Sequence, residues 1–123
     1  MRYRTLGRTG LRVSEVGMGT LEAFDVPPGR RAILATKVRE SGAAAARASI
    51  ERSFERLRTE ALDLLQVHNM AGWREVLPVL EEYRERGRVR FLGLTYYERE
   101  SEPEVLAAMR TGRFDAVQVP CWL

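Results

Sequence analysis

The segment AILATKVRESGAAAARASIERSFERLRTEALDLLQVHN, residues 32–69, decides the fold of this chain. Its two ends, Ala32–Val38 and Leu62–Val67, are short apolar runs rich in strand-forming residues. The stretch between them is amphipathic at helical spacing and is long enough for a crossover helix. The order strand, helix, strand predicts a parallel βαβ unit.

Lys37 and His68 lie at the carboxyl ends of these two predicted strands, where ligands of α/β proteins bind. Lys37 is the one lysine among 20 basic residues, and His68 is the one histidine. A lysine carries a compact charge and a titratable amine, whereas an arginine is not deprotonated in a protein. Both residues are therefore candidates for a catalytic site. The alternative is that Lys37 extends into solvent from the strand end and that His68 bonds to backbone.

Predicted strands and helices alternate along the rest of the chain. The five predicted strands cover residues 13–21, 32–38, 62–67, 88–97 and 114–123. Three predicted helices connect the last four of these strands. A hairpin over Arg2–Ser14 comes first, with Gly10 available for positive φ in its turn. This alternation predicts an α/β protein in one domain, residues 1–123, as a wound sheet or part of a barrel.

The first two helices have predicted ends. Ser41 is the predicted N-cap of the first helix, whose buried face includes Ala46, Ile50 and Phe54. The second helix spans about Trp73–Arg86 and ends at a glycine, Gly87.

The third helix is predicted to begin with a capping box. Ser101 and Glu104 have the spacing of that motif, and a proline lies between them. Leu106 and Met109 are the predicted buried residues of this helix.

One segment interrupts the pattern. LEAFDVPPGRR, residues 21–31, contains two prolines and a glycine and is predicted to be a loop. It joins two strands that should be parallel, without a helix between them. A connection of about a dozen residues is at the short limit for such a crossover.

Composition favours a cytoplasmic globular protein. The 123 residues are 45% hydrophobic and 30% charged, and the apolar runs are too short to predict a transmembrane helix. The single cysteine, Cys121, fits a reducing compartment. We expect no membrane association, and no set of metal ligands is recognised.

The positive charge does not predict nucleic-acid binding. The net charge is +3 and the pI is about 9.5, but the arginines are interleaved with glutamates. Neither a basic run of five or six residues nor an RNA-binding motif is present. A solvated helix face of mixed charge explains the arginines better.

Five segments, in order, resemble the aldo-keto reductases. They are RTLGRTGLRVSEVGMGT (4–20), ILATKV (33–38), SIERSFERLRTEALDLLQVHN (49–69), VLEEYRERGRVRFLGLT (79–95) and RFDAVQVP (113–120). The first is similar to that family's opening hairpin and first barrel strand, and the second to the strand that ends in its catalytic lysine. The third is similar to its signature helix and the strand that ends in its catalytic histidine. The fourth is similar to a strand that ends in a cofactor-contacting Ser or Thr, and the fifth to the strand whose glutamine holds the nicotinamide carboxamide. The resemblance implies a partial (β/α)8 barrel, NADPH as cofactor, and a small aldehyde or ketone as substrate.

The resemblance also implies roles for individual residues. Lys37 would lower the pKa of a proton-donating tyrosine, and His68 would orient the substrate carbonyl. Thr95 and Gln118 would hydrogen-bond the nicotinamide amide, and the backbone of Thr20 would approach the cofactor.

The chain departs from the family pattern in two places. The segment that carries the family's catalytic aspartate and tyrosine should lie between Thr20 and Ala32, where this chain has residues 21–31 and no tyrosine. Asp25 is there, but a loop aspartate is more often a turn former. The last two β/α units are also missing, since a full barrel needs about 250 residues. The sequence therefore predicts a truncated barrel with an internal deletion and impaired activity.

Two further expectations concern the proton donor and association. Tyr96 and Tyr97, at a strand end, are the candidates to replace the missing tyrosine; alternatively, they only line the rim or cover apolar surface. An unclosed parallel sheet has two open edges, so we expect a homodimer through them. The function classes left open are an NADPH-dependent reductase and a non-catalytic nucleotide-binding or structural relic of that fold.

Overall fold

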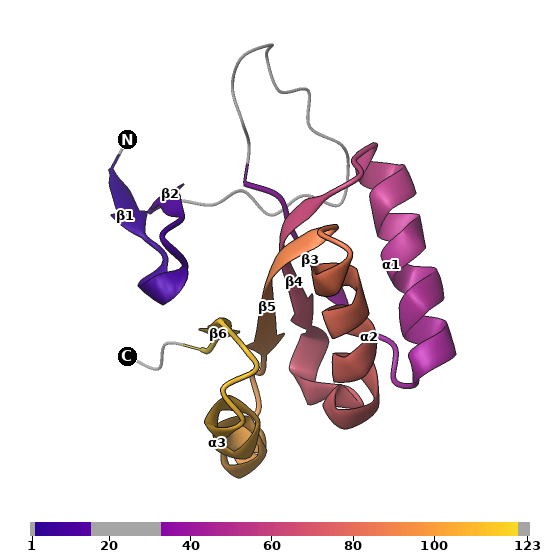
Figure 1. Ribbon diagram of the computed structural model, residues 1–123. Helices are drawn as coiled ribbons and strands as arrows, with labels where there is room; N and C mark the ends of the chain where they lie inside the picture. The colour runs from indigo at the N-terminus through magenta and orange to yellow at the C-terminus, as the bar shows by residue number, and fades with distance from the viewer. Residues whose placement is uncertain (1, 16–32, 121–123) are drawn as a thin grey trace.

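The computed structural model describes residues 2–15 and 33–120, which form two sheets and three α-helices (Figure 1). The strands are β1 (Tyr3–Thr5), β2 (Arg12–Ser14), β3 (Ala35–Val38), β4 (Leu62–Val67), β5 (Val89–Thr95) and β6 (Ala116–Gln118). The helices are α1 (Ala43–Leu57), α2 (Trp73–Glu85) and α3 (Glu102–Arg110), with short 3₁₀ turns at Gly7–Thr9, His68–Met70 and Arg99–Ser101.

The larger sheet is parallel, with strand order β3-β4-β5-β6. One helix connects each consecutive pair of strands, so the predicted βαβ unit and the three crossover helices are confirmed. The described residues contain four of the five predicted parallel strands. Val13 and Ser14 pair antiparallel with Arg4 and Tyr3, which confirms the predicted hairpin, and residues 16–21 of the predicted strand at 13–21 lie outside the described residues.

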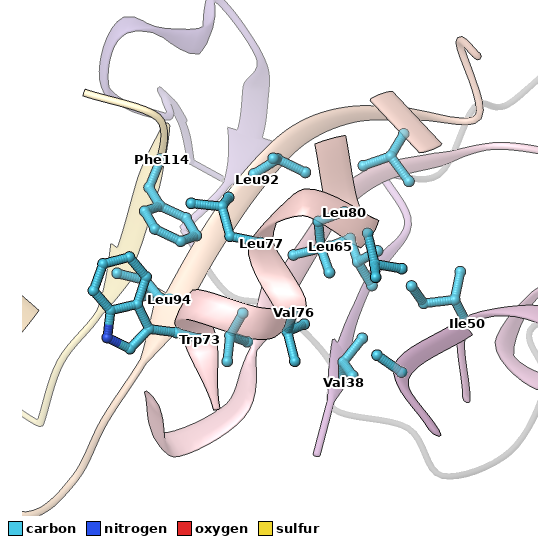
Figure 2. Close-up of a cluster of buried hydrophobic side chains, with 14 of the residues drawn as sticks. Val38, Ile50, Leu65, Trp73, Val76, Leu77, Leu80, Leu92, Leu94 and Phe114 are labelled. Atoms are coloured by element: carbon cyan, nitrogen blue, oxygen red, sulfur yellow. The ribbon is translucent and has the colours of Figure 1, made fainter. Parts of the chain in front are cut away.

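The core lies between the sheet and helices α1 and α2, which cover one face side by side (Figure 1). Figure 2 shows Val38, Leu65 and Leu94 of the sheet meeting Ile50 of α1 and Val76 and Leu80 of α2. All six are at most 1% exposed. Burial of such side chains contributes roughly 1.5–3 kcal/mol each, which makes this layer the main source of stability.

Helix α1 buries the predicted residues Ala46, Ile50 and Phe54, which recur every four positions. The prediction of Ser41 as N-cap is wrong. Gly42 is the N-cap and has a φ of 92°, a conformation that serine rarely adopts. The Ser41 Cβ instead lies against the backbone of Gly72, where an added Cβ would be only 2.8 Å away.

Helix α2 ends as predicted. Gly87 has a φ of 72° and donates its N–H to the Arg84 carbonyl at 2.9 Å. Arg88 donates its N–H to the Tyr83 carbonyl, also at 2.9 Å. These two bonds form a Schellman motif, which satisfies carbonyls left free at the helix end.

Helix α3 begins and packs differently from the prediction. Ser101 is its N-cap but makes no side-chain cap bond. Glu104 instead accepts hydrogen bonds from Trp73 Nε1 at 3.0 Å and Arg74 at 2.6 Å, so a partner on α2 replaces the capping box.

The buried residues of α3 are Val105 and Ala108. Leu106 is exposed and Met109 is partly buried, so the predicted face was displaced by one residue. Ala108 is fully buried in the core cluster.

The hairpin forms a separate sheet, and its turn contacts the chain just before β6. Gly10 has the expected positive φ, 71°. The Arg8 guanidinium donates to the carbonyl of Phe114 at 3.1 Å. Leu11 is buried.

Candidate functional site

Lys37 and His68 lie at the same end of the parallel sheet. In the register of β3 and β4, Lys37 is opposite Gln66 and Val38 is opposite Val67, which immediately precedes His68. Because side chains alternate along a strand and Val38 faces the helices, Lys37 projects from the opposite face. That face corresponds to the interior of a barrel.

The environment of His68 disfavours its charged form. The residue is half-buried, and this burial is the main cause that lowers the pKa of the imidazole below its ordinary 6.5. The positive charges of Arg39 and then Lys37 lower the pKa further. The imidazole is therefore neutral at pH 7 and can donate one N–H and accept at the other nitrogen.

Arg39 is a site residue that the sequence analysis missed. It follows Val38, as His68 follows Val67, so both lie one residue beyond a register pair. The available signal was that Arg39 lies two residues after Lys37, a spacing that puts both side chains on the same face of an extended chain. Arginine is so common in this chain that the signal did not stand out.

Thr95 and Gln118 continue the same rim. They are register partners at the carboxyl ends of β5 and β6. Thr95 is buried, whereas Gln118 is exposed. The structure thus brings Lys37, His68, Thr95 and Gln118 to one end of the sheet, and Thr20 lies outside the described residues.

The turn that follows His68 has an unusual backbone. Asn69 and Met70 both have positive φ, 51° and 59°. The Asn69 N–H donates to Thr95 Oγ1 at 3.0 Å. Only the tolerance of asparagine for this conformation could have signalled the turn in the sequence.

A row of residues crosses the sheet from Lys37 on the same face, two residues before the level of His68. Lys37, Gln66, Gly93 and Ala116 are consecutive register partners across the four strands. Gln66 is buried, and its amide nitrogen is 3.5 Å from the Leu94 carbonyl oxygen. The Gln66 side chain occupies the space that the missing side chain of Gly93 leaves.

All four tyrosines lie in the described residues, and their surroundings differ. Tyr96 packs against the core cluster on the helix side. Tyr97 is 57% exposed, and its hydrogen bond to Glu98 raises the pKa of its hydroxyl. Burial and the bond to Glu51 raise the pKa of Tyr83 to about 12. Tyr3 is on the hairpin.

A hollow of about 310 Å³ between α2 and α3 is lined by Met70, Gly72, Trp73, Arg74, Glu75 and Glu104. Among residues 2–15 and 33–120, no three His, Cys, Asp or Glu side chains gather as metal ligands would.

A comparison with models of protein families shows which family the chain belongs to. The model of the aldo/keto reductase family matches residues 15–122. The chain belongs to this family. The helices in the described part of this family member are all too short or too polar to cross a membrane.

Solved structures show the same fold. An aldo/keto reductase from Brucella melitensis aligns over 72% of this chain with 20% identity and a TM-score of 0.59. A Pseudomonas aeruginosa protein named as an aldo-keto reductase aligns over 95% of the chain, with 24% identity and a TM-score of 0.72. A glycerol dehydrogenase from Gluconobacter oxydans aligns over 68%, with 29% identity and a TM-score of 0.54.

These alignments use only part of the solved proteins. The chain spans 37%, 67% and 25% of their respective lengths. No curated protein matches the chain. The predicted partial aldo-keto reductase barrel is confirmed.

Proposed function

We propose that this chain is an NADPH-dependent oxidoreductase that reduces aldehydes or ketones to alcohols. The observation that carries the proposal is the shared rim: Lys37 and His68 end neighbouring parallel strands, and the charge of Lys37 acts on the His68 imidazole. Ligands of this fold bind at that end of the strands. Lys37 and His68 are the proposed catalytic residues.

The nicotinamide amide would be held by Thr95 and Gln118, with Thr20 as a third proposed contact. Thr95 and Gln118 fit an amide chemically. The Thr95 hydroxyl accepts from Asn69 and still has its own hydrogen to donate, and the Gln118 carboxamide both donates and accepts. The chemistry supplied by bound NADPH is a hydride for the carbonyl carbon.

The proposed roles of Lys37 and His68 follow from their charge states. The neutral imidazole of His68 donates an N–H to the substrate carbonyl oxygen and so orients it. The Lys37 ammonium stabilises the negative charge that develops on that oxygen. A proton donor is the weak point, because Tyr83 and Tyr96 belong to or pack against the core cluster and the hydrogen bond to Glu98 raises the pKa of Tyr97. We therefore propose that turnover is slow.

NADPH oxidation in the presence of a reactive aldehyde tests the proposal. Lys37→Met should abolish the turnover that the unaltered chain shows. Arg56→Met removes another exposed cation, on the outer helix α1, and should leave turnover unchanged. Turnover that survives Lys37→Met would refute the assignment of Lys37.

A non-catalytic, nucleotide-binding relic is the second candidate. The positions of the four tyrosines favour it. NADPH binding without oxidation would support this candidate, and a purely structural role predicts that no nucleotide binds.

We also propose a homodimer through the open edges of the sheet. In the described part of the chain, β3 and β6 are the two edges of the parallel sheet, and two sheets of four strands would supply the eight strands of a closed barrel. Val117 and Val119 at the β6 edge are 40% and 51% exposed, and a strand of a second copy paired at this edge would cover them. Size-exclusion chromatography that gives a 14 kDa monomer would contradict the dimer.

The remaining proposals concern partners and location. A small carbonyl compound is the proposed substrate, and neither nucleic acid nor a membrane is a proposed partner. We propose a cytoplasmic location, which the use of a single cysteine supports.

A further inference from the structure

The backbone between β4 and α2 is held in a conformation that it would not adopt unaided. Asn69 and Met70 are consecutive non-glycine residues with positive φ. Such residues are uncommon, cost free energy, and persist where the surrounding structure fixes them. The turn begins at His68, so whatever fixes the turn also fixes the backbone that carries the imidazole.

Thr95 is the contact that fixes this turn from the neighbouring strand. Its Oγ1 accepts the Asn69 N–H at 3.0 Å, across a sequence separation of 26 residues. Thr95 is only 4% exposed, so little water can compete for that amide. The pairing of Val67 with Leu94 places the threonine directly beside the turn.

The other end of the turn is anchored by apolar packing and by its own backbone. Met70 is buried in the core cluster. The Ala71 N–H donates to the His68 carbonyl at 3.1 Å. Between these anchors, the Asn69 amide depends on the threonine hydroxyl.

We infer that Thr95 is a positioning residue for His68, acting through the backbone amide of Asn69. This inference rests on the proposed function and adds to it, since the resemblance implied only a cofactor contact for Thr95. The hydroxyl performs two tasks at once: it accepts from Asn69, and it keeps its own hydrogen for a ligand.

The experiment uses the full chain and nuclear magnetic resonance. His68 is the one histidine, so its ring signals need no separation from others. Thr95→Val replaces the hydroxyl by a methyl group of similar size, and Thr95→Ser keeps the hydroxyl. Thr111→Val is the matched control, because the Thr111 hydroxyl also accepts a backbone N–H, from Arg113 at 3.2 Å, and donates to the Ala108 carbonyl, at the end of α3 rather than beside His68.

Thr95→Val should speed hydrogen exchange of the Asn69 amide about tenfold, as expected when a hydrogen bond of ordinary net strength is lost. It should also change the His68 ring signals and move the pKa of the imidazole towards 6.5, because the ring gains solvent while Arg39 and Lys37 stay in place. Thr95→Ser and Thr111→Val should behave like the unaltered chain.

Three outcomes would overturn the inference. They are unchanged Asn69 exchange and His68 titration in Thr95→Val, failure of Thr95→Ser to preserve both, and an Asn69 amide in the unaltered chain that exchanges as fast as a free one. The last measurement remains available if Thr95→Val does not fold. None of the three needs cofactor or turnover, so failure of the proposed reductase activity would be recognised separately.

Discussion

Gly93 lies directly against the side chain of Gln66. A Cβ added to Gly93 would be 2.9 Å from Gln66 Cγ and 3.1 Å from the carbonyl oxygen of Ala116. Both neighbours are register partners of Gly93 on the barrel-interior face, on β4 and β6. A glycine in the middle of a strand usually weakens it, but here it makes room for a buried glutamine beneath the rim.

Gly93→Ala should lower the free energy of unfolding by about 1–3 kcal/mol, because the methyl group overpacks this position. Urea denaturation followed by circular dichroism measures the change. Gln66→Ala in the same chain should restore part of the loss, since it removes the closer neighbour and leaves the Ala116 carbonyl. Gly93→Ala with unchanged stability would show that the strands do not approach as described.

Tyr83 should make stability depend on pH between about 10 and 12. Its folded pKa of about 12 exceeds the ordinary 10.0, so its contribution is complete below pH 10 and is lost as pH rises towards 12. The difference corresponds to at most about 3 kcal/mol. Tyr83→Phe should remove this part of the decline.

Denaturation midpoints at pH 9 and pH 11.5 measure the effect of Tyr83, with Tyr3→Phe on the exposed hairpin as the control. An equal loss of stability in Tyr83→Phe and the unaltered chain would contradict the assignment.

Arg39→Gln should raise the pKa of His68, because a positive charge beside the imidazole is removed while the effect of burial remains. The ring signals of this single histidine, followed from pH 4 to 8, give the value directly. Arg56→Gln, a change on the outer helix α1, should not shift it. A His68 pKa that is the same in Arg39→Gln and in the unaltered chain would contradict a position of the Arg39 guanidinium close to the imidazole.

Elements built on local periodicity could be predicted from the sequence. The strand Leu62–Val67 has the predicted ends, and Gly87 ends its helix as predicted. Parallel strands bring their carboxyl ends to one edge of a sheet. The neighbouring positions of Lys37 and His68 could therefore be inferred before any coordinates.

Features decided by contacts distant in the sequence could not be predicted. Glu104 has capping-box spacing, but its carboxylate accepts a hydrogen bond from the indole of Trp73, 31 residues away. The Asn69 turn depends on Thr95, on a different strand. Local preferences contain no information about such partners, and they are overridden where a buried donor needs an acceptor.

The most direct test of the shared rim is a titration of the isotope-labelled chain with NADPH, followed by the backbone amide signals. Binding should shift the amides of Lys37, His68, Thr95 and Gln118, all at the carboxyl ends of the strands. The amides of Leu34 and Asp63, at the opposite ends of β3 and β4, should stay in place. Shifts confined to that opposite end, or no shift at millimolar NADPH, would contradict the central claim.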